Sequence, residues 1–132
     1  MKTLSINVGS LCEILRNGKK VKTGIFKQPT EGSIEVDRLG LEGDYQANKK
    51  LHGGIHKAIC VYPAEHYDLW REELGKPDLS FGDFGENLTT FGLMEDEVCL
   101  GDRFRIGSTE MVVTQPREPC VTLNARLDIM DL

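Results

Sequence analysis

The feature that most constrains the fold is the frequency with which glycine and proline interrupt the chain, which favours strands over helices. The 132 residues include 14 glycines and 5 prolines, and the apolar segments between them are short and rich in β-branched residues. Such segments favour strands. We expect strands at residues 4–8, 21–26, 34–36, 58–62, 98–100, 103–106 and 111–114, with a four-residue hairpin loop at 107–110.

One segment is predicted to be helical. Pro63 suits a first helical turn, Tyr67, Trp70 and Leu74 fall on one face, and Gly75 with the following proline ends the pattern. Short strands with few helices predict a mainly β fold whose exposed edges are removed by closure into a barrel. The length fits a single domain over residues 1–132.

Charge and cysteine usage exclude several classes of function. The net charge of −5 argues against nucleic acid as the main partner. No apolar stretch is long enough to cross a bilayer and no signal-peptide cleavage site is evident, so we expect a cytoplasmic protein without a membrane partner. Four widely spaced cysteines predict free thiols. Cys60 and Cys99 lie in apolar runs, where we expect them to be shielded within strands.

Two glycine-rich loops, at residues 38–57 and 75–87, are candidates for function. In the first, Gly53 and Gly54 can bring backbone N–H groups close to an oxyanion, with Lys57 adding positive charge. Alternatively, the lysine is an ordinary solvated charge and His52 only a turn residue. His52 and His56 are four residues apart, but the intervening glycines oppose a helical zinc pair.

The second loop continues into Phe-Gly-Asp-Phe-Gly-Glu-Asn-Leu-Thr-Thr at 81–90. Phe84 is expected to anchor this loop in the core. Asn87 can donate and accept hydrogen bonds, as a heterocyclic ligand requires. It could equally tie the loop to itself.

The most specific segment is Gln-Pro-Arg-Glu-Pro-Cys-Val-Thr-Leu-Asn-Ala-Arg at 115–126. Pro116 and Pro119 restrict the backbone before Cys120, at a point where a short helix could begin. A helix N-terminus and the nearby Arg117 would favour the thiolate. Cys120 is therefore the best candidate for a reactive thiol or a metal ligand, and a buried structural cysteine is the alternative.

Together the motifs resemble a known family. They are Gly-Asp-x-Gln at 43–46, His-Gly-Gly-x-x-Lys-Ala at 52–58, Tyr-Pro-Ala-Glu-His-Tyr at 62–67, Phe-Gly-Glu-Asn-Leu at 84–88, Val-x-x-Gly-Asp-x-Phe-x-Ile-Gly at 98–107 and Gln-Pro-Arg-x-Pro-Cys at 115–120. This combination resembles the MOSC domain, named after the C-terminal domain of molybdenum cofactor sulfurases, and in particular its small stand-alone bacterial members of the YiiM type.

The resemblance implies a MOSC-type β-barrel that binds the molybdenum cofactor, molybdopterin; pyridoxal phosphate is not expected. Cys120 would be the metal ligand and catalytic residue. The other residues carried over to the cofactor site are His52, Gly53, Gly54, Lys57, Asn87 and Arg117. Relatives of this kind reduce N-hydroxylated compounds, such as hydroxylamino bases, with electrons from a redox partner protein.

The resemblance also leaves alternatives to an enzyme. A non-catalytic carrier of the cofactor or of sulfur is one, and an interaction domain with structural cysteines is another. Family members usually continue beyond the cysteine motif, whereas this chain stops at Leu132. We therefore expect the closing strands of the barrel to be missing, and the open strand edges to favour a homodimer.

Overall fold

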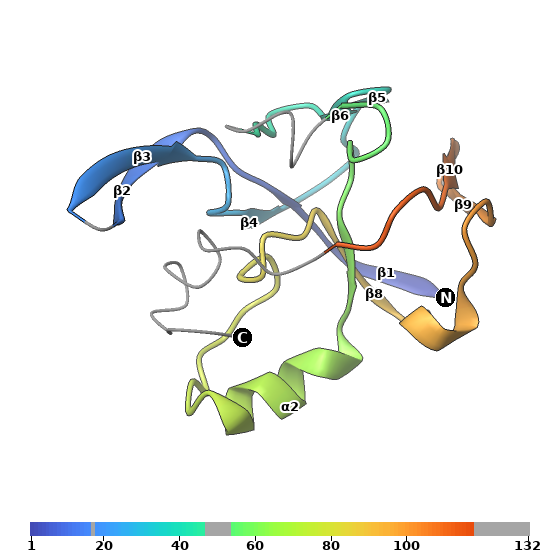
Figure 1. Ribbon diagram of the computed structural model, residues 1–132. Coiled ribbons are helices and arrows are strands. Elements are labelled where there is room, and N and C mark those ends of the chain that lie inside the picture. Colours follow the sequence, from blue (N-terminus) through green and yellow to red (C-terminus); the bar gives the residue numbers. More distant parts are fainter. Residues whose placement is uncertain (17, 47–53, 118–132) are drawn as a thin grey trace.

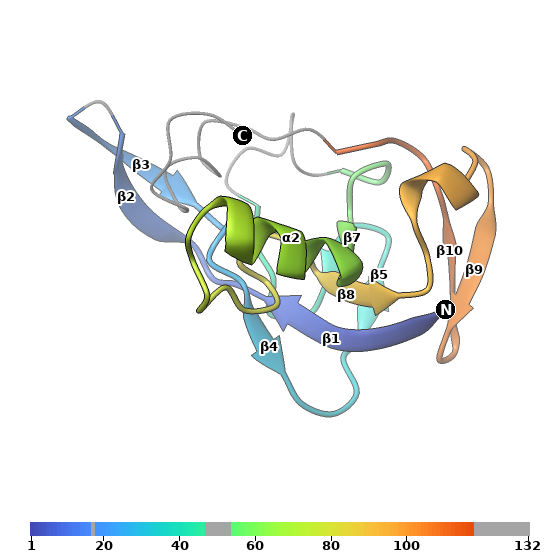
Figure 2. The same cartoon turned by 90° about the horizontal axis from the view of Figure 1, so that it is seen from below.

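A four-stranded mixed sheet forms the centre of the fold. The structure is a computed structural model that describes residues 1–16, 18–46 and 54–117. The sheet has the order β4-β1-β8-β7, formed by β4 (Gln28–Thr30), β1 (Lys2–Val8), β8 (Leu88–Phe91) and β7 (Val61–Pro63). β1 pairs antiparallel with β4 and β8, while β7 runs parallel to β8 (Figure 2).

Helix α2 (Glu65–Glu73) lies in the connection between the parallel strands β7 and β8 (Figures 1 and 2). The helix is confirmed, but its expected start is wrong: Pro63 is the last residue of β7. A proline is tolerated there because β7 is an edge strand. At the other end, the Gly75 N–H donates to the Glu72 carbonyl, and the helix ends as expected.

The main core cluster lies where α2 packs against the loop that precedes β8. Tyr67 is fully buried, with ring centroids 5.2 Å from Phe81 and 5.1 Å from Phe84. Trp70 and Leu74 pack against the same cluster. The shared face of the helix and the anchoring role of Phe84 are therefore confirmed, and this aromatic cluster holds the loop before β8 against the helix.

In the described part of the chain, three two-stranded hairpins surround the sheet. They are β2 (Cys12–Arg16) with β3 (Lys19–Thr23), β5 (Val36–Asp37) with β6 (Gly40–Leu41), and β9 (Arg103–Ile106) with β10 (Thr109–Val112). The loop of the last hairpin has two residues rather than the expected four. Gly107 has φ 59°, which suits a tight two-residue turn, so pairing resumes at Thr109.

The expected strand at 98–100 is wrong. The short 3₁₀ helix η1 (Glu95–Glu97) comes directly before it, and a turn follows in which the Asp102 N–H donates to the Cys99 carbonyl at 3.1 Å. These local contacts compete with strand pairing. The remaining expected strands overlap β1, β3, β5, β7, β9 and β10, whereas β2, β4, β6 and β8 were not predicted.

The described residues therefore have a mainly β fold with a single α-helix, as the sequence predicts. Among the residues described, no helix has the length and apolar character needed to span a bilayer.

Candidate functional site

Two of the sequence motifs meet in space through hydrogen bonds to backbone carbonyl groups. The Thr114 hydroxyl donates to the His56 carbonyl, and Arg117 Nη2 donates to the Lys57 carbonyl at 2.6 Å. The bonded residues are 58 and 60 positions apart in the sequence. The strand end that leads into the Gln-Pro-Arg motif therefore lies directly against the end of the His-Gly-Gly motif.

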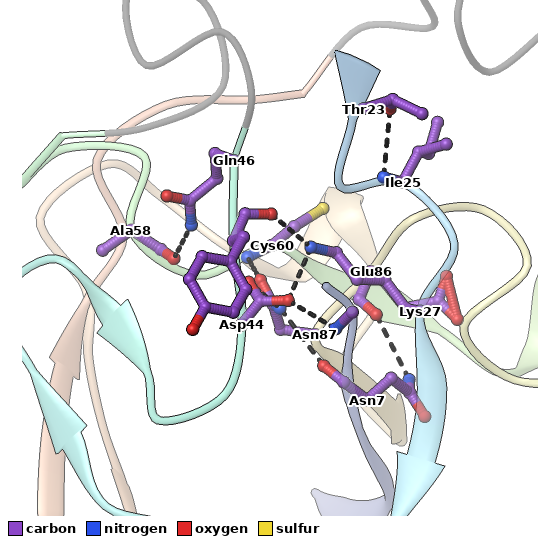
Figure 3. A network of polar contacts seen from close by, with 12 residues as sticks. Asn7, Thr23, Ile25, Lys27, Asp44, Gln46, Ala58, Cys60, Glu86 and Asn87 are labelled. Atoms are coloured by element: carbon purple, nitrogen blue, oxygen red, sulfur yellow. Dashed lines mark hydrogen bonds and ion pairs between the residues drawn. The ribbon is translucent and has the colours of Figure 1, made fainter. Parts of the chain in front are cut away.

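Further hydrogen bonds hold the backbone that follows Lys57. Gln46 Nε2 donates to the Ala58 carbonyl at 3.5 Å, and the Cys60 N–H donates to Asn87 Oδ1 at 3.0 Å (Figure 3). The Cys60 carbonyl accepts from the backbone N–H groups of Asn87 and Leu88 at 2.8 and 3.0 Å. Contacts from several distant segments thus fix residues 56–60, although these residues lie outside any regular strand and β7 begins only at Val61.

Asn87 lies at the centre of a buried polar network (Figure 3). Only 3% of the residue is exposed. Besides accepting from Cys60, its Nδ2 donates to the Asn7 carbonyl at 3.2 Å and to Asp44 Oδ2 at 2.9 Å. Both amide hydrogens therefore bind protein acceptors. The structure gives Asn87 a role in joining segments, and its contact with a cofactor stays a prediction.

A buried ion pair supports the same network. Lys27 Nζ lies 2.6 Å from Asp44 Oδ1, and the two side chains are only 6% and 1% exposed. The Gly9 N–H also donates to Asp44 Oδ1 at 2.9 Å, and Lys27 also donates to the Tyr45 carbonyl at 3.2 Å. Burying two charges is costly unless their remaining hydrogen bonds are satisfied. The contacts to the Gly9 N–H and the Tyr45 carbonyl supply such hydrogen bonds here. The pair therefore fixes the loop that carries Tyr45.

Glu86 adds a buried carboxyl group next to Asn87. Its Oε1 accepts hydrogen bonds from the Tyr67 hydroxyl, the Gly82 N–H and the Thr89 hydroxyl, while its buried Oε2 has no partner among the described residues. Burial raises the pKa of Glu86 above its usual range, and the hydrogen bond from Tyr67 opposes this. Burial likewise raises the pKa of Tyr67. The protonated carboxyl is therefore favoured more than it is in water.

The described cysteines differ in their environments. Cys60 is half-buried directly before β7, and burial raises its pKa to about 11 although Arg117 opposes the shift. Its thiol therefore stays protonated at neutral pH. Cys99, in contrast, is exposed, so the expected shielding of Cys99 is wrong. It lies in a turn, where its N–H donates to Asp102 Oδ2 at 2.8 Å, rather than in a strand.

The residues carried over from the resemblance fall into two groups. Gly54, Lys57, Asn87 and Arg117 are described, and the Arg117–Lys57 contact brings two of them together. His52, Gly53 and Cys120 lie outside the described residues, so their roles stay predictions. His56 is exposed. Over residues 1–16, 18–46 and 54–117, no group of three His, Cys, Asp or Glu side chains could hold a metal ion.

The described donors fit an anionic group such as a phosphate-bearing pterin. Lys57 and Arg117 are cationic and half-buried, and the bond to the Lys57 carbonyl uses only Nη2 of a guanidinium that has five N–H donors. Gly54 has φ 83°, and a Cβ atom built there would meet no atom within 4 Å. The space at Gly54 and the remaining donors of Arg117 are therefore compatible with an anion close to this backbone.

Sequence reasoning missed three residues that shape this region. Asp44 belongs to the Gly-Asp-x-Gln motif, which was recognised without a role for its carboxylate. Lys27 has no local motif, and Thr114 was expected only as a strand residue. Their partners lie 17 to 58 residues away, so no local pattern could have identified the contacts.

Comparison with known proteins places the chain in a family. Residues 48–132 match the MOSC domain family. Over 129 residues the chain is 46% identical to the uncharacterized protein YflK of Bacillus subtilis, covering 98% of this chain and 58% of YflK. It is also 37% identical over 112 residues to a reductase of Gibberella moniliformis, covering 83% of this chain and 20% of the reductase.

A solved structure supports the same assignment. The crystal structure of YiiM from Geobacillus stearothermophilus matches with a TM-score of 0.73 and 36% identity, covering 97% of this chain and 57% of that protein. The chain thus spans little more than half the length of YflK and of this YiiM. Since the family match covers more than half of the sequence and agrees with the fold, the chain belongs to the MOSC domain family.

Proposed function

We propose that this chain binds the molybdenum cofactor and takes part in the reduction of N-hydroxylated compounds, such as hydroxylamino bases. The observation that carries the proposal is the contact between the two motifs: Arg117 and Thr114 hold the carbonyl groups of Lys57 and His56. This contact brings the Arg117 guanidinium to the backbone of the loop that also carries Gly54 and Lys57, three residues before Cys120 in the sequence. The reductase among the relatives supports the reaction class.

The residues of this chain would bind and orient the cofactor. The Lys57 ammonium and the Arg117 guanidinium would hold its phosphate by charge-assisted hydrogen bonds. The backbone of Gly53 and Gly54, with His52 beside them, would line the same side. The Cys120 thiolate would ligate the metal.

The chemistry supplied by the bound cofactor is removal of the oxygen from an N–OH group, which leaves as water after two electrons and two protons are taken up. The electrons would come from a redox partner protein. The buried thiol of Cys60 stays protonated at neutral pH, so it does not compete with Cys120 as an anionic ligand.

The decisive experiment uses protein purified from a host that makes the cofactor. We expect stoichiometric molybdenum and turnover of a hydroxylamino base. Cys120→Ser should lose both, whereas Cys99→Ser, which alters an exposed thiol, should keep both. Bound cofactor without turnover would favour the carrier function instead. A Cys120→Ser protein that retains its molybdenum and its turnover would refute the proposed ligand.

A second test addresses the anion contacts. Lys57→Ala combined with Arg117→Ala should weaken cofactor retention roughly tenfold or more, because each removes a hydrogen bond from a charged donor. Lys22→Ala, which removes an exposed lysine on β3, should not. Retention can be followed as molybdenum remaining after dialysis at increasing salt. If the double variant retains the cofactor like the parent protein, the phosphate site lies elsewhere.

A further inference from the structure

A groove lies beside the loop of Gly54 and has no role in the function proposed above. It has a volume of about 760 Å³ and is lined mainly by residues 35–46, together with Leu11 and Gly54. Most of its wall comes from the β5–β6 hairpin and the loop after it. Because Gly54 lines both the groove and the candidate cofactor site, a ligand in the groove would lie next to that site.

The wall of the groove combines exposed apolar groups with an aromatic ring. Tyr45 and Leu39 are 52% and 58% exposed, and Leu11 is 47% exposed. Within the described part of the chain, the hydrogen bonds of Tyr45 come from its backbone: its N–H donates to the Gly9 carbonyl and its carbonyl accepts from Lys27. Its ring is therefore available to a ligand, and the apolar surface suits a flat organic body.

The charges on the same wall are all negative among the described residues. Glu35, Asp37, Glu42 and Asp44 line the groove, whereas no described lysine or arginine does. Asp44 is neutralised by Lys27, and Asp37 accepts from the N–H groups of the hairpin turn.

The two glutamates remain without such partners. No described ion pair or hydrogen bond involves either side chain. The Glu42 N–H donates to the Glu35 carbonyl at 2.9 Å, so the two residues are neighbours across the hairpin. Two neighbouring glutamates in a groove that Tyr45 also lines favour a cation, since carboxylates and the face of an aromatic ring both attract positive charge.

We propose that this groove binds organic cations with a flat apolar body, and that it selects the non-reacting part of the substrate by charge. The second clause rests on the proposed function, because it makes the groove the specificity region of that same site. Binding of organic cations in the groove does not depend on the proposed function, because the groove is formed by residues of this chain without the cofactor. An anionic substrate body would be repelled by Glu35 and Glu42.

The test uses the cofactor-free protein and three probes that share one ring system: 2-naphthylmethylamine, which is a cation at neutral pH, neutral 2-naphthylmethanol and anionic 2-naphthoate. Binding is followed by nuclear magnetic resonance titration. We expect the cation to bind about threefold or more tightly than the alcohol, as two exposed ion pairs would give, and the carboxylate to bind most weakly. The largest shifts should fall on Leu39 and Tyr45.

The variants make the result specific to the groove. Glu35→Gln combined with Glu42→Gln should bring the cation-to-alcohol ratio close to one. Glu72→Gln combined with Glu73→Gln, which removes the same charge from an exposed part of α2, should leave the ratio unchanged. Tyr45→Ala should weaken binding of all three probes, because it removes the ring that they share as a contact.

A parent protein that binds the cation and the alcohol equally well, or whose shifts lie away from the hairpin, overturns the inference. So does a Glu35→Gln, Glu42→Gln protein that keeps the full preference. These outcomes are independent of molybdenum content and turnover, which test the proposed function. A failure of either proposal can therefore be told from a failure of the other.

Discussion

At the scale of single residues, this fold depends heavily on buried polar side chains. Among the residues that the structure describes, only four hydrophobic ones are nearly inaccessible, and Leu88 is the one of them that lies in the central sheet. Buried polar residues in and next to the same sheet include Asn7, Glu86, Asn87 and Thr89. Each has at least one protein hydrogen bond. Because a buried polar group that loses its partner is costly, these residues specify how the segments fit together.

Asn87→Ala should destabilise the protein by about 3 kcal/mol, because it leaves the Cys60 N–H and Asp44 Oδ2 without a partner. Urea unfolding followed by fluorescence measures the effect. Ser108→Ala in the exposed hairpin turn is the control and should change stability by less than about 0.5 kcal/mol. If Asn87→Ala unfolds at the same urea concentration as the control, the network does not hold the segments together.

Glu86 should make stability fall as the pH rises. Its pKa is raised in the folded state by burial, so the folded protein binds this proton more tightly than the unfolded chain does. The contribution of this proton to the free energy of unfolding is fully present below the ordinary pKa of a glutamate. It is lost as the pH rises through the higher pKa of the folded state. Glu86→Gln cannot titrate. The difference in unfolding free energy between parent and variant, measured from about pH 4 to pH 8, should therefore move against the parent with increasing pH. A constant difference would contradict the raised pKa.

At the scale of elements, the helices and strands predicted correctly from the sequence are those whose determinants lie close together in the chain. Helix α2 and the strands of the last hairpin were predicted from residues within one short stretch. Strand β8 was missed because its sequence, Leu-Thr-Thr-Phe, has a polar centre. Thr89 is buried there because its hydroxyl bonds with Glu86 and with Asn7, which is 82 residues away. The β-branched side chains of the two threonines in β8 were the one feature of the local sequence that favoured a strand there.

In the candidate site, too, the features within one sequence motif were predicted and the contacts between distant residues were not. The motifs that contain Lys57 and Arg117 were recognised from the sequence, and the structure brings them into contact. The Lys27–Asp44 pair was not predicted, because its two residues are 17 positions apart without a shared motif. A tertiary pairing of this kind depends on the path of the loop, which local patterns do not determine.

The loop that contains Asp44 and Tyr45 also depends on a close backbone approach. A Cβ atom at Gly24, just after β3, would lie 1.9 Å from the Tyr45 carbonyl oxygen. Gly24→Ala should therefore displace this loop and cost about 3 kcal/mol or more in a urea melt. Gly32→Ala is the matched change, because a Cβ there meets nothing within 4 Å. It should cost only about 1 kcal/mol from its positive φ. Equal losses in the two variants would contradict the packing argument.

At the scale of the whole molecule, the described surface leaves strand edges and apolar side chains exposed. The β2–β3 hairpin pairs with no other described strand, and Leu15 on β2 is 70% exposed. Such an edge favours pairing with a second chain. We therefore propose that the protein forms a homodimer through this hairpin.

Sedimentation of the parent protein over a range of micromolar concentrations should show a dimer. Leu15→Lys should shift the distribution to monomer, because a charge on an open edge opposes pairing. Leu100→Lys changes an equally exposed leucine away from this hairpin, 69% exposed, and should leave the dimer intact. A parent protein that sediments only as a monomer would contradict the proposed pairing.

The pairing of β1 with β8 also has a consequence for the order of folding. Residues from the start of the chain pair with residues 88–91, and Asn87 donates to the carbonyl of Asn7, 80 positions earlier in the sequence. Contacts between such distant residues require closure of a long loop before they contribute free energy, which slows folding. During synthesis, the central sheet cannot assemble until β8 has left the ribosome. The hydrogen bond from the Cys60 N–H to Asn87 forms in that same late step, so the chain cannot fix the backbone that follows Lys57 before β8 is in place.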